Sequence, residues 1–293
     1  MGQVQIARLL SIVCGDGEVS QVDVNSANLD RRTLLAGFAT SADTKIDEHL
    51  PEQSHKQEAA HLAMPTTKER QSSLIWRSFS FSKKLHTALK AYCTDKLPAD
   101  CAFVSTDDCI SAVLWQAFAK ARVEREGPHG ELGFVRLADM RKLTGTPEAY
   151  TGNLVTSTTA KSTIGDLCKR SIGSIAAELR SALDSELLRH NLRTHISPQR
   201  QAAIRNAPNV QDRLHTLKMS SWSKADCYNF DFGLGLGRPE AVRRPKFTPI
   251  EGIVYLLPKA PDGGIIATIC LREDDMSEMI KNNVFTRYAQ YIG

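Results

Sequence analysis

The feature that most constrains the fold is a run of apolar residues at helical spacing over residues 106–124. Ser105, with Asp108 three positions later, can cap the exposed backbone amides at the start of this run. The apolar residues recur every three or four positions and define one face of a helix: Ile110, Val113, Leu114, Ala117, Phe118 and Ala121. Such a face is stable only when another layer covers it. The segment therefore predicts a helix that packs on a sheet or on further helices.

Strand-like and helix-like segments alternate along the rest of the chain. Short runs rich in β-branched or aromatic side chains predict strands over residues 74–81, 133–138, 253–257 and 265–271. Two prolines and an Asp-Gly-Gly sequence separate the last two runs, which indicates a hairpin. Apolar periodicity predicts further helices over residues 4–13, 83–92, 164–183 and 276–288. This order predicts an α/β fold, with layers of flanking helices on a mixed sheet.

Composition and charge exclude several classes of protein. The chain has 293 residues and a net charge of only +4, whereas nucleic-acid-binding domains usually show a clustered basic face. Its apolar runs fall far short of the roughly 20 residues that cross a membrane. Its seven cysteines include no Cys-x-x-Cys pair, so neither a disulfide framework nor a metal site is expected. We therefore expect a cytoplasmic protein with no nucleic-acid, membrane or metal partner.

A glycine-rich segment, Asp-Phe-Gly-Leu-Gly-Leu-Gly-Arg, occupies residues 231–238. Alternate glycines let the backbone turn tightly or approach a partner closely. The Asp-Phe-Gly triplet also occurs in protein kinases, but the upstream glycine-rich loop, strand lysine and His-Arg-Asp loop of kinases are absent from this sequence. A dinucleotide-binding loop is excluded as well, because Pro239 follows the glycines where a helix would be required.

With this segment the sequence resembles the BAHD acyl-CoA-dependent acyltransferases, whose Asp-Phe-Gly-Trp-Gly motif corresponds to residues 231–235. The likeness is greatest to the fungal branch that includes trichothecene 3-O-acetyltransferase, which shares the departure at Leu234. It extends over essentially the whole chain, because other motifs stand in the family's order: Ser105-Thr106-Asp107-Asp108, Asp139-Met140-Arg141, Tyr150-Thr151-Gly152-Asn153, Ser220-Ser221-Trp222, residues 239–245 and residues 288–291.

The resemblance implies a chloramphenicol acetyltransferase-like fold and acyl transfer from coenzyme A to a hydroxyl or amine. The expected donor is acetyl-CoA, the expected acceptor is a fungal secondary metabolite such as a trichothecene-like terpenoid, and no bound cofactor is expected. In the family, two similar domains enclose a tunnel that the substrates enter from opposite faces. The His of a His-x-x-x-Asp motif takes the acceptor proton, and general-base help of this kind is typically worth about 10²–10⁴-fold. Relatives are usually monomeric, and we expect a monomer.

The histidine motif is where this sequence departs from the family, because none of its eight histidines has Asp four residues later. In the family, Gly-Gln and an apolar helix follow that motif closely, and residues 2–4 match this continuation. We therefore expect the chain to begin just after the motif. Residues 1–72 are then expected to be a remnant of the first domain and a crossover linker. Residues 73–293 are expected to be the second domain, in which a segment near 243–262 can pair back to the first.

Asp231 has two interpretations, a catalytic carboxylate or a structural one that holds the glycine-rich turn. The resemblance favours the structural role, with Arg141 as its partner. Ser220, Ser221 and Trp222 either line the tunnel near the pantetheine arm or acyl group, or form an ordinary core strand.

The glycines Gly233 and Gly235 and the neighbouring Arg238 complete the expected tunnel residues. Basic residues also gather beyond the glycines: Arg238, Arg243, Arg244 and Lys246. Their charges suit the phosphates of coenzyme A, although a solvated basic loop has the same composition. Tyr150 and Asn153 are expected to fix a turn.

Two functions of different kinds fit the sequence. The first is an acyl-CoA-dependent O-acyltransferase of secondary metabolism. The alternative is a truncated, catalytically inactive pseudoenzyme or binding module that lacks the catalytic His. A purely structural or regulatory partner protein has no sequence feature in its favour.

Overall fold

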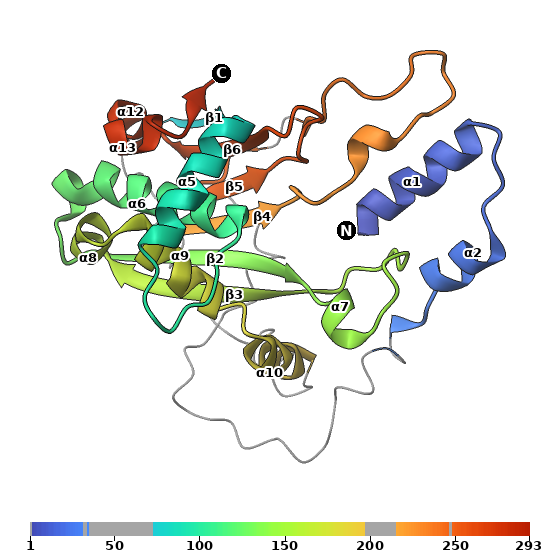
Figure 1. Cartoon of the computed structure of the whole chain (residues 1–293), viewed down its shortest axis with the longest axis horizontal. Coiled ribbons are helices and arrows are strands. Elements are labelled where there is room, and N and C mark those ends of the chain that lie inside the picture. The colour runs from blue at the N-terminus through green and yellow to red at the C-terminus, as the bar shows by residue number, and fades with distance from the viewer. Residues whose placement is uncertain (1, 32–33, 35–72, 197–214, 246–247) are drawn as a thin grey trace.

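The computed structural model describes residues 2–31, 34, 73–196, 215–245 and 248–293 (Figure 1). Its strands are β1 (Leu74–Phe81), β2 (Glu131–Asp139), β3 (Val155–Thr163), β4 (Thr216–Ser221), β5 (Ile253–Leu256), β6 (Ile265–Arg272) and β7 (Gln290–Tyr291). Its helices are α1 (Gly2–Cys14), α2 (Gln21–Ala27), α5 (Lys83–Asp95), α6 (Thr106–Glu126), α7 (Arg141–Thr144), α8 (Ile164–Lys169), α9 (Ile172–Ser181), α10 (Ser185–Ile196), the 3₁₀ turn η2 (Cys227–Asn229), α12 (Glu273–Lys281) and α13 (Asn283–Thr286). None of the helices in these ranges is long and apolar enough to cross a membrane.

The strands form one seven-stranded sheet in the order β3-β2-β4-β5-β6-β1-β7. β4 lies near its centre and pairs in parallel with both β2 and β5. The other pairs are antiparallel, and they include the predicted β5–β6 hairpin, in which Tyr255 lies opposite Thr268. The mixed sheet with its flanking helices confirms the predicted α/β class.

The main core lies between one face of this sheet and the helices that cover it, with α6 at the centre (Figure 1). The predicted apolar face of α6 is buried, with Ile110, Leu114 and Phe118 at most 1% exposed. The predicted capping box is also present, formed by Ser105 and Asp108. Because the sheet, α5, α9 and α12 all pack against α6, most of its circumference is buried, which is typical of a central helix.

Two predicted helices are each divided in two by a capping residue. Residues 164–183 form α8 and α9, because the Ser171 side chain accepts a hydrogen bond from the amide three residues later and starts a new helix. Residues 276–288 are divided at Asn282, whose side chain accepts from the amides of Val284 and Phe285. The apolar periodicity continues through both breaks, so it could not reveal them.

Several elements were not predicted, among them β3, α10 and α2. β3 pairs with β2 along its whole length, but its sequence is mostly Thr and Ser and shows no apolar alternation. α10 carries three charged side chains, and among its residues 185–194, whose side chains the structure describes, Leu188 and Leu192 are buried. α2 lies within the predicted linker and begins at Ser20, whose side chain accepts from the Asp23 amide. Most of that linker, residues 35–72, lies outside the described residues.

A second, smaller core lies between α10 and the segment that follows β2, and Leu29 and Leu34, which follow α2, pack against it. It consists of Met140, Tyr150, Leu154, Leu188 and Leu192. α2 attaches beside it, because the Ala27 carbonyl accepts from the amide and the hydroxyl of Thr151. α1 has no buried residue and lies apart from the main core (Figure 1).

A buried ion-pair network joins α6 to α12. The Arg122 side chain is 1% exposed; its Nε donates to Asp275 Oδ2 at 2.9 Å, and the guanidinium also pairs with Glu251. Arg125 donates to the other Asp275 oxygen at 2.6 Å. Burial raises the pKa of Glu251, and the Arg122 charge only partly offsets this effect. One carboxylate is thus shared by two guanidinium groups across the interface of two helices.

We expect Asp275→Ala to lower the free energy of unfolding by about 3–5 kcal/mol, because it removes the buried carboxylate that Arg122 and Arg125 share. The neighbouring Asp274 is a matched control, since its side chain is 71% exposed and lies 3.7 Å from Arg272. Asp274→Ala should change the same quantity by less than about 1 kcal/mol. Urea denaturation followed by circular dichroism measures both variants. Equal losses would show that the network does not stabilise the fold.

Candidate functional site

The candidate site lies where β4 and β5 end together at one edge of the sheet. The strands are parallel, and the C-terminal edge of parallel strands is where open α/β sheets bind ligands. β4 pairs with β2 only as far as Met219, opposite Arg136. Beyond that point it is paired with β5, and the Trp222 amide still donates to the Leu256 carbonyl at 2.7 Å. Successive side chains of this segment point to opposite faces of the sheet.

The sheet face opposite α6, here called the outer face, carries an aromatic cluster at this edge. Trp222 donates from its indole N–H to Ser220 Oγ at 3.2 Å. Its ring lies 6.1 Å from that of Tyr255, which in turn stacks on Trp76 at 6.1 Å. The Arg244 guanidinium lies 3.4 Å from the Tyr255 ring centroid and 5.0 Å from that of Trp222, and burial lowers its pKa. The cluster thus presents ring surfaces, a hydroxyl and a cation.

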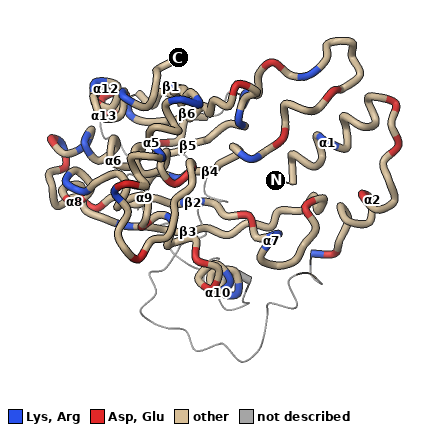
Figure 2. Tube along the Cα trace, in the orientation of Figure 1, with Lys and Arg blue, Asp and Glu red and all other residues tan. Residues whose placement is uncertain are grey.

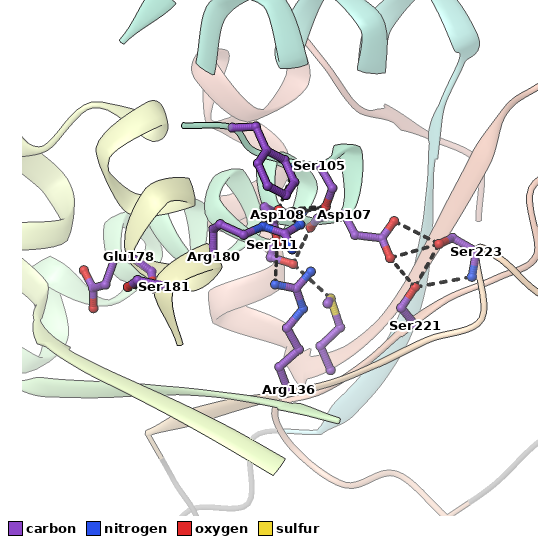
Figure 3. A network of polar contacts seen from close by, with 12 residues as sticks. Ser105, Asp107, Asp108, Ser111, Arg136, Glu178, Arg180, Ser181, Ser221 and Ser223 are labelled. Carbon is purple, nitrogen blue, oxygen red and sulfur yellow. Dashed lines mark hydrogen bonds and ion pairs between the residues drawn. The ribbon is translucent and has the colours of Figure 1, made fainter. Parts of the chain in front are cut away.

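The helix side of the same segment is attached to the first turn of α6 (Figure 3). Ser221 Oγ donates to Asp107 Oδ2 at 2.6 Å, and Ser223 Oγ lies 2.9 Å from both oxygens of that carboxylate. The Ser223 amide also donates to Ser221 Oγ at 3.3 Å. Ser221 and Ser223, two positions apart at the end of β4, are therefore both bound to the Asp107 carboxylate.

The next residue of α6, Asp108, is fully buried and turns to the other side (Figure 3). It accepts from Arg136 at 2.6 Å, from Arg180 Nε at 2.8 Å, and from both the amide and the hydroxyl of Ser105 at 2.7 Å. Burial raises its pKa, but the Arg136 charge and the hydrogen bonds from Ser105 outweigh burial and hold the pKa below its ordinary value. Asp108 is therefore a structural anion that ties α6 to β2 and α9.

The glycine-rich loop lies away from the main core and is largely exposed, with Leu234 at 73% and Leu236 at 84%. Gly233, Gly235 and Gly237 all have φ near +70°, a region that side chains disfavour. Gly233 also rests against the Cys14 carbonyl at the end of α1, where a Cβ would clash. The glycines are thus needed for backbone conformation, and at Gly233 for contact with α1.

The expected ion pair between Asp231 and Arg141 is not formed. Asp231 is exposed and accepts from the Gly233 amide at 3.0 Å. Arg141 is buried and donates to Asp139 Oδ1 at 2.8 Å and to the carbonyls of Tyr150 and Gly152 at 2.9 and 2.7 Å. Asp139, at the end of β2 and two positions before Arg141, is therefore the partner of Arg141 in place of the predicted Asp231.

The basic residues beyond the glycines do not gather into one group. Arg238 donates to the Asn229 side chain at 3.1 Å, Arg243 donates to its neighbour's carbonyl at 3.0 Å, and Arg244 lies in the aromatic cluster. Lys246 lies outside the described residues. Figure 2 shows Lys and Arg interspersed with Asp and Glu over the part of the chain that the structure describes. Arg244 is thus the basic residue of this group that the fold brings to the end of β4.

Of the other predicted site residues, Tyr150 is buried beside Arg141, whose guanidinium lies 5.7 Å from its ring centroid. The Asn153 carbonyl accepts from Arg31, next to the short loop after α2. Tyr150 thus packs inside the turn that follows α7, as predicted, whereas Asn153 is exposed and contributes its backbone carbonyl, so the role predicted for its side chain stays a prediction. Within the described ranges, no three His, Cys, Asp or Glu side chains gather as a metal ion would require.

Comparison with known proteins decides the family. The model of the Transferase family matches residues 9–286. The chain belongs to this family, that of the BAHD-type acyltransferases. The resemblance inferred from the motifs is thereby confirmed.

Among its relatives, trichothecene 3-O-acetyltransferase TRI101 of Fusarium sporotrichioides is 35% identical over 100% of this chain and 63% of its own length. O-acetyltransferase dmxR13 of Cryptosporiopsis sp. is 32% identical over 100% of this chain and 64% of its own. The crystal structure of F. graminearum TRI101 complexed with coenzyme A and T-2 mycotoxin matches with a TM-score of 0.81 at 34% identity, and the chain covers 64% of it. Vinorine synthase, at 18% identity and a TM-score of 0.63, supports the fold alone. The chain thus spans slightly less than two thirds of the relatives it matches.

Sequence reasoning missed Asp107, Ser223 and Tyr255. Tyr255 sits in a run predicted only as a strand, and its partners come from distant segments. Ser223 could have been found from its spacing, because Ser221 and Ser223 share one side of an extended segment. Asp107 was quoted as part of a motif, but the two adjacent aspartates could not be assigned different partners from the sequence.

We expect Asp108→Asn to lower the free energy of unfolding by about 3 kcal/mol at pH 7, because the buried Arg136 and the half-buried Arg180 lose their anion. The folded-state pKa of Asp108 lies below the unfolded value of about 3.9, so the stabilisation is present above that value and is lost as pH falls through the folded pKa. The gap between wild type and variant should therefore narrow below about pH 4. Urea denaturation at several pH values measures it. A gap of equal size at neutral and acid pH would contradict this assignment.

Arg141→Ala should lower the free energy of unfolding by about 3 kcal/mol, because two buried carbonyls and Asp139 lose their donor. Asp231→Ala should change it by less than about 0.5 kcal/mol, since that side chain is exposed. A double-mutant cycle between the two positions is expected to give a coupling near zero. A coupling above about 1 kcal/mol would restore the pair that the family resemblance implies.

Proposed function

We propose that this chain carries the second domain and part of the first domain of an acyl-CoA-dependent O-acetyltransferase. Its acyl donor is acetyl-CoA, and its acceptor is a hydroxyl group of a fungal secondary metabolite such as a trichothecene-like terpenoid. The observation that carries the proposal is the aromatic cluster at the end of β4, in a chain that is 35% identical to trichothecene 3-O-acetyltransferase TRI101 over its whole length. The expected division at residue 73 is part of this proposal.

The chemistry at the site is direct acyl transfer. The acceptor oxygen attacks the thioester carbonyl carbon, the C–S bond breaks, and the acetyl group stays on the acceptor oxygen. A general base takes the hydroxyl proton, which ends on the departing coenzyme A sulfur. Ser220 Oγ already accepts from the Trp222 indole, so its own proton can be donated to the thioester carbonyl oxygen, where negative charge develops.

A second candidate is a binding module without catalysis. It is favoured by one observation: no histidine of this sequence has Asp four residues later, so the family's general base is not among its residues. The aromatic cluster does not depend on that base. Binding of acetyl-CoA and turnover are therefore separate questions for this chain.

The remaining proposals concern partners and location. Small-molecule substrates are the proposed partners, and the proposed state is a monomer. The proposed compartment is the cytoplasm, which accords with seven cysteines that form no disulfide and of which Cys93, Cys109 and Cys270 are buried.

Calorimetric titration of the purified chain with acetyl-CoA tests the proposal first. We expect saturable binding that Trp222→Ala weakens by about tenfold or more, because an aromatic anchor in a pocket commonly dominates binding. Tyr92→Ala, on the solvent side of α5, should bind as the wild type does. No binding by a folded wild-type chain would refute the proposed function.

Turnover on a panel of alcohol acceptors then separates the two candidates. Binding without turnover supports the binding module, and turnover supports the enzyme with a base other than the family's histidine. The released thiol of coenzyme A provides the readout for both arms.

A further inference from the structure

Asp107 differs from the other carboxylates around α6. Asp108, Asp275 and Glu251 each pair with at least one arginine. The hydrogen bonds that Asp107 accepts come from the neutral hydroxyls of Ser221 and Ser223, and it takes part in no ion pair within the described ranges. A half-buried anion with this set of donors is attached to the edge of the candidate site.

The contact restricts both serines. Ser221 and Ser223 both direct their hydroxyl protons to Asp107, and the Ser223 amide donates back to Ser221 Oγ. Neither hydroxyl can rotate to another acceptor without losing a hydrogen bond to a charged group, the stronger kind. The carboxylate itself lies in the first turn of α6, where the helix dipole favours negative charge.

The position of the segment makes this attachment important. β2 supports β4 only as far as Met219, so residues 220–223 are held by β5 on one flank and by Asp107 from the helix side. Side chains alternate along an extended chain, so fixing Ser221 and Ser223 also fixes Ser220 and Trp222 on the outer face. The indole–hydroxyl bond at 3.2 Å is the result visible in the structure.

We propose that Asp107 is a positioning residue of the acyl-CoA site: through Ser221 and Ser223 it holds Ser220 and Trp222 in the orientation that receives the acyl-CoA. The inference rests on the proposed function, because it assumes that Ser220 and Trp222 contact this substrate. Asp107 itself touches neither substrate and acts from behind the strand.

The experiment compares variants of the whole chain. Asp107→Ala removes the acceptor, Asp107→Asn keeps one oxygen, and the double variant Ser221→Ala/Ser223→Ala removes both donors. Asp166→Asn is the matched control. Asp166 also lies in the first turn of a helix, α8, and also accepts from a serine hydroxyl, that of Ser162, but it is not in contact with residues 220–223. Two quantities are measured: affinity for acetyl-CoA by calorimetry, and backbone hydrogen exchange of peptides covering residues 216–224. Thermal melting establishes that each variant is folded.

Asp107→Ala should weaken acetyl-CoA binding by about tenfold or more, the effect of losing hydrogen bonds to a charged group. Asp107→Asn should retain part of the affinity, and Asp166→Asn should retain all of it. Hydrogen exchange should rise in residues 219–223 and stay unchanged in the centre of α6. In the background of the double serine variant, Asp107→Ala should weaken binding no further, because the partners are already gone.

Wild-type affinity in folded Asp107→Ala would overturn the inference, and so would a loss that adds in full to that of the double serine variant. If the wild-type chain itself binds no acetyl-CoA, the proposed function fails first. Hydrogen exchange then decides the remaining part: faster exchange confined to residues 219–223 upholds the anchoring by Asp107, and unchanged exchange overturns it.

Discussion

The acidic first turn of α6 is the constraint on which the rest of the structure depends. Its two adjacent carboxylates face opposite ways (Figure 3). Asp108 binds Arg136 of β2 and Arg180 of α9, whereas Asp107 binds the serines that end β4. One helical turn therefore fixes two parallel strands and a second helix, and a shift of that turn would move the ends of both strands together.

The other end of α6 is held by a different kind of interaction. There Arg122 is the buried charge, and the carboxylates come from Asp275 of α12 and from Glu251, two residues before β5. The helix is thus fixed near both ends by ion pairs with buried partners, between which most of its buried side chains are apolar. Such pairs gain little over well-packed apolar residues, but removing one partner is costly. Because their partners lie on β2, α9, α12 and just before β5, these pairs attach both ends of α6 to four separate parts of the fold.

The sequence predicted the layers better than it predicted the site. Strong periodicities, such as those of α6 and β6, and the capping box at Ser105 are local signals and were confirmed. β3 was missed because its Thr and Ser residues carry no apolar alternation, although the full pairing with β2 stabilises it as a strand. The partner of Arg141 was predicted wrongly, because sequence shows which charges exist but not which of two aspartates the fold brings near. Cluster members such as Tyr255 have no local signal, since their contacts come from three distant segments.

The charges around the end of β4 lie on opposite sides of one strand. Asp107 is behind it, on the helix side, and the Arg244 guanidinium is in front of it, over the rings of Tyr255 and Trp222. In a region of reduced dielectric, fixed charges act more strongly than they would in water. In the proposed reaction, attack on the thioester builds negative charge on its carbonyl oxygen, and a cation beside that oxygen stabilises this charge. An anion behind the strand would oppose it if uncompensated, but two hydroxyl donors and the N-terminal end of α6 already offset its charge. This explains how a carboxylate can hold the strand in place without impairing the chemistry proposed on its other face.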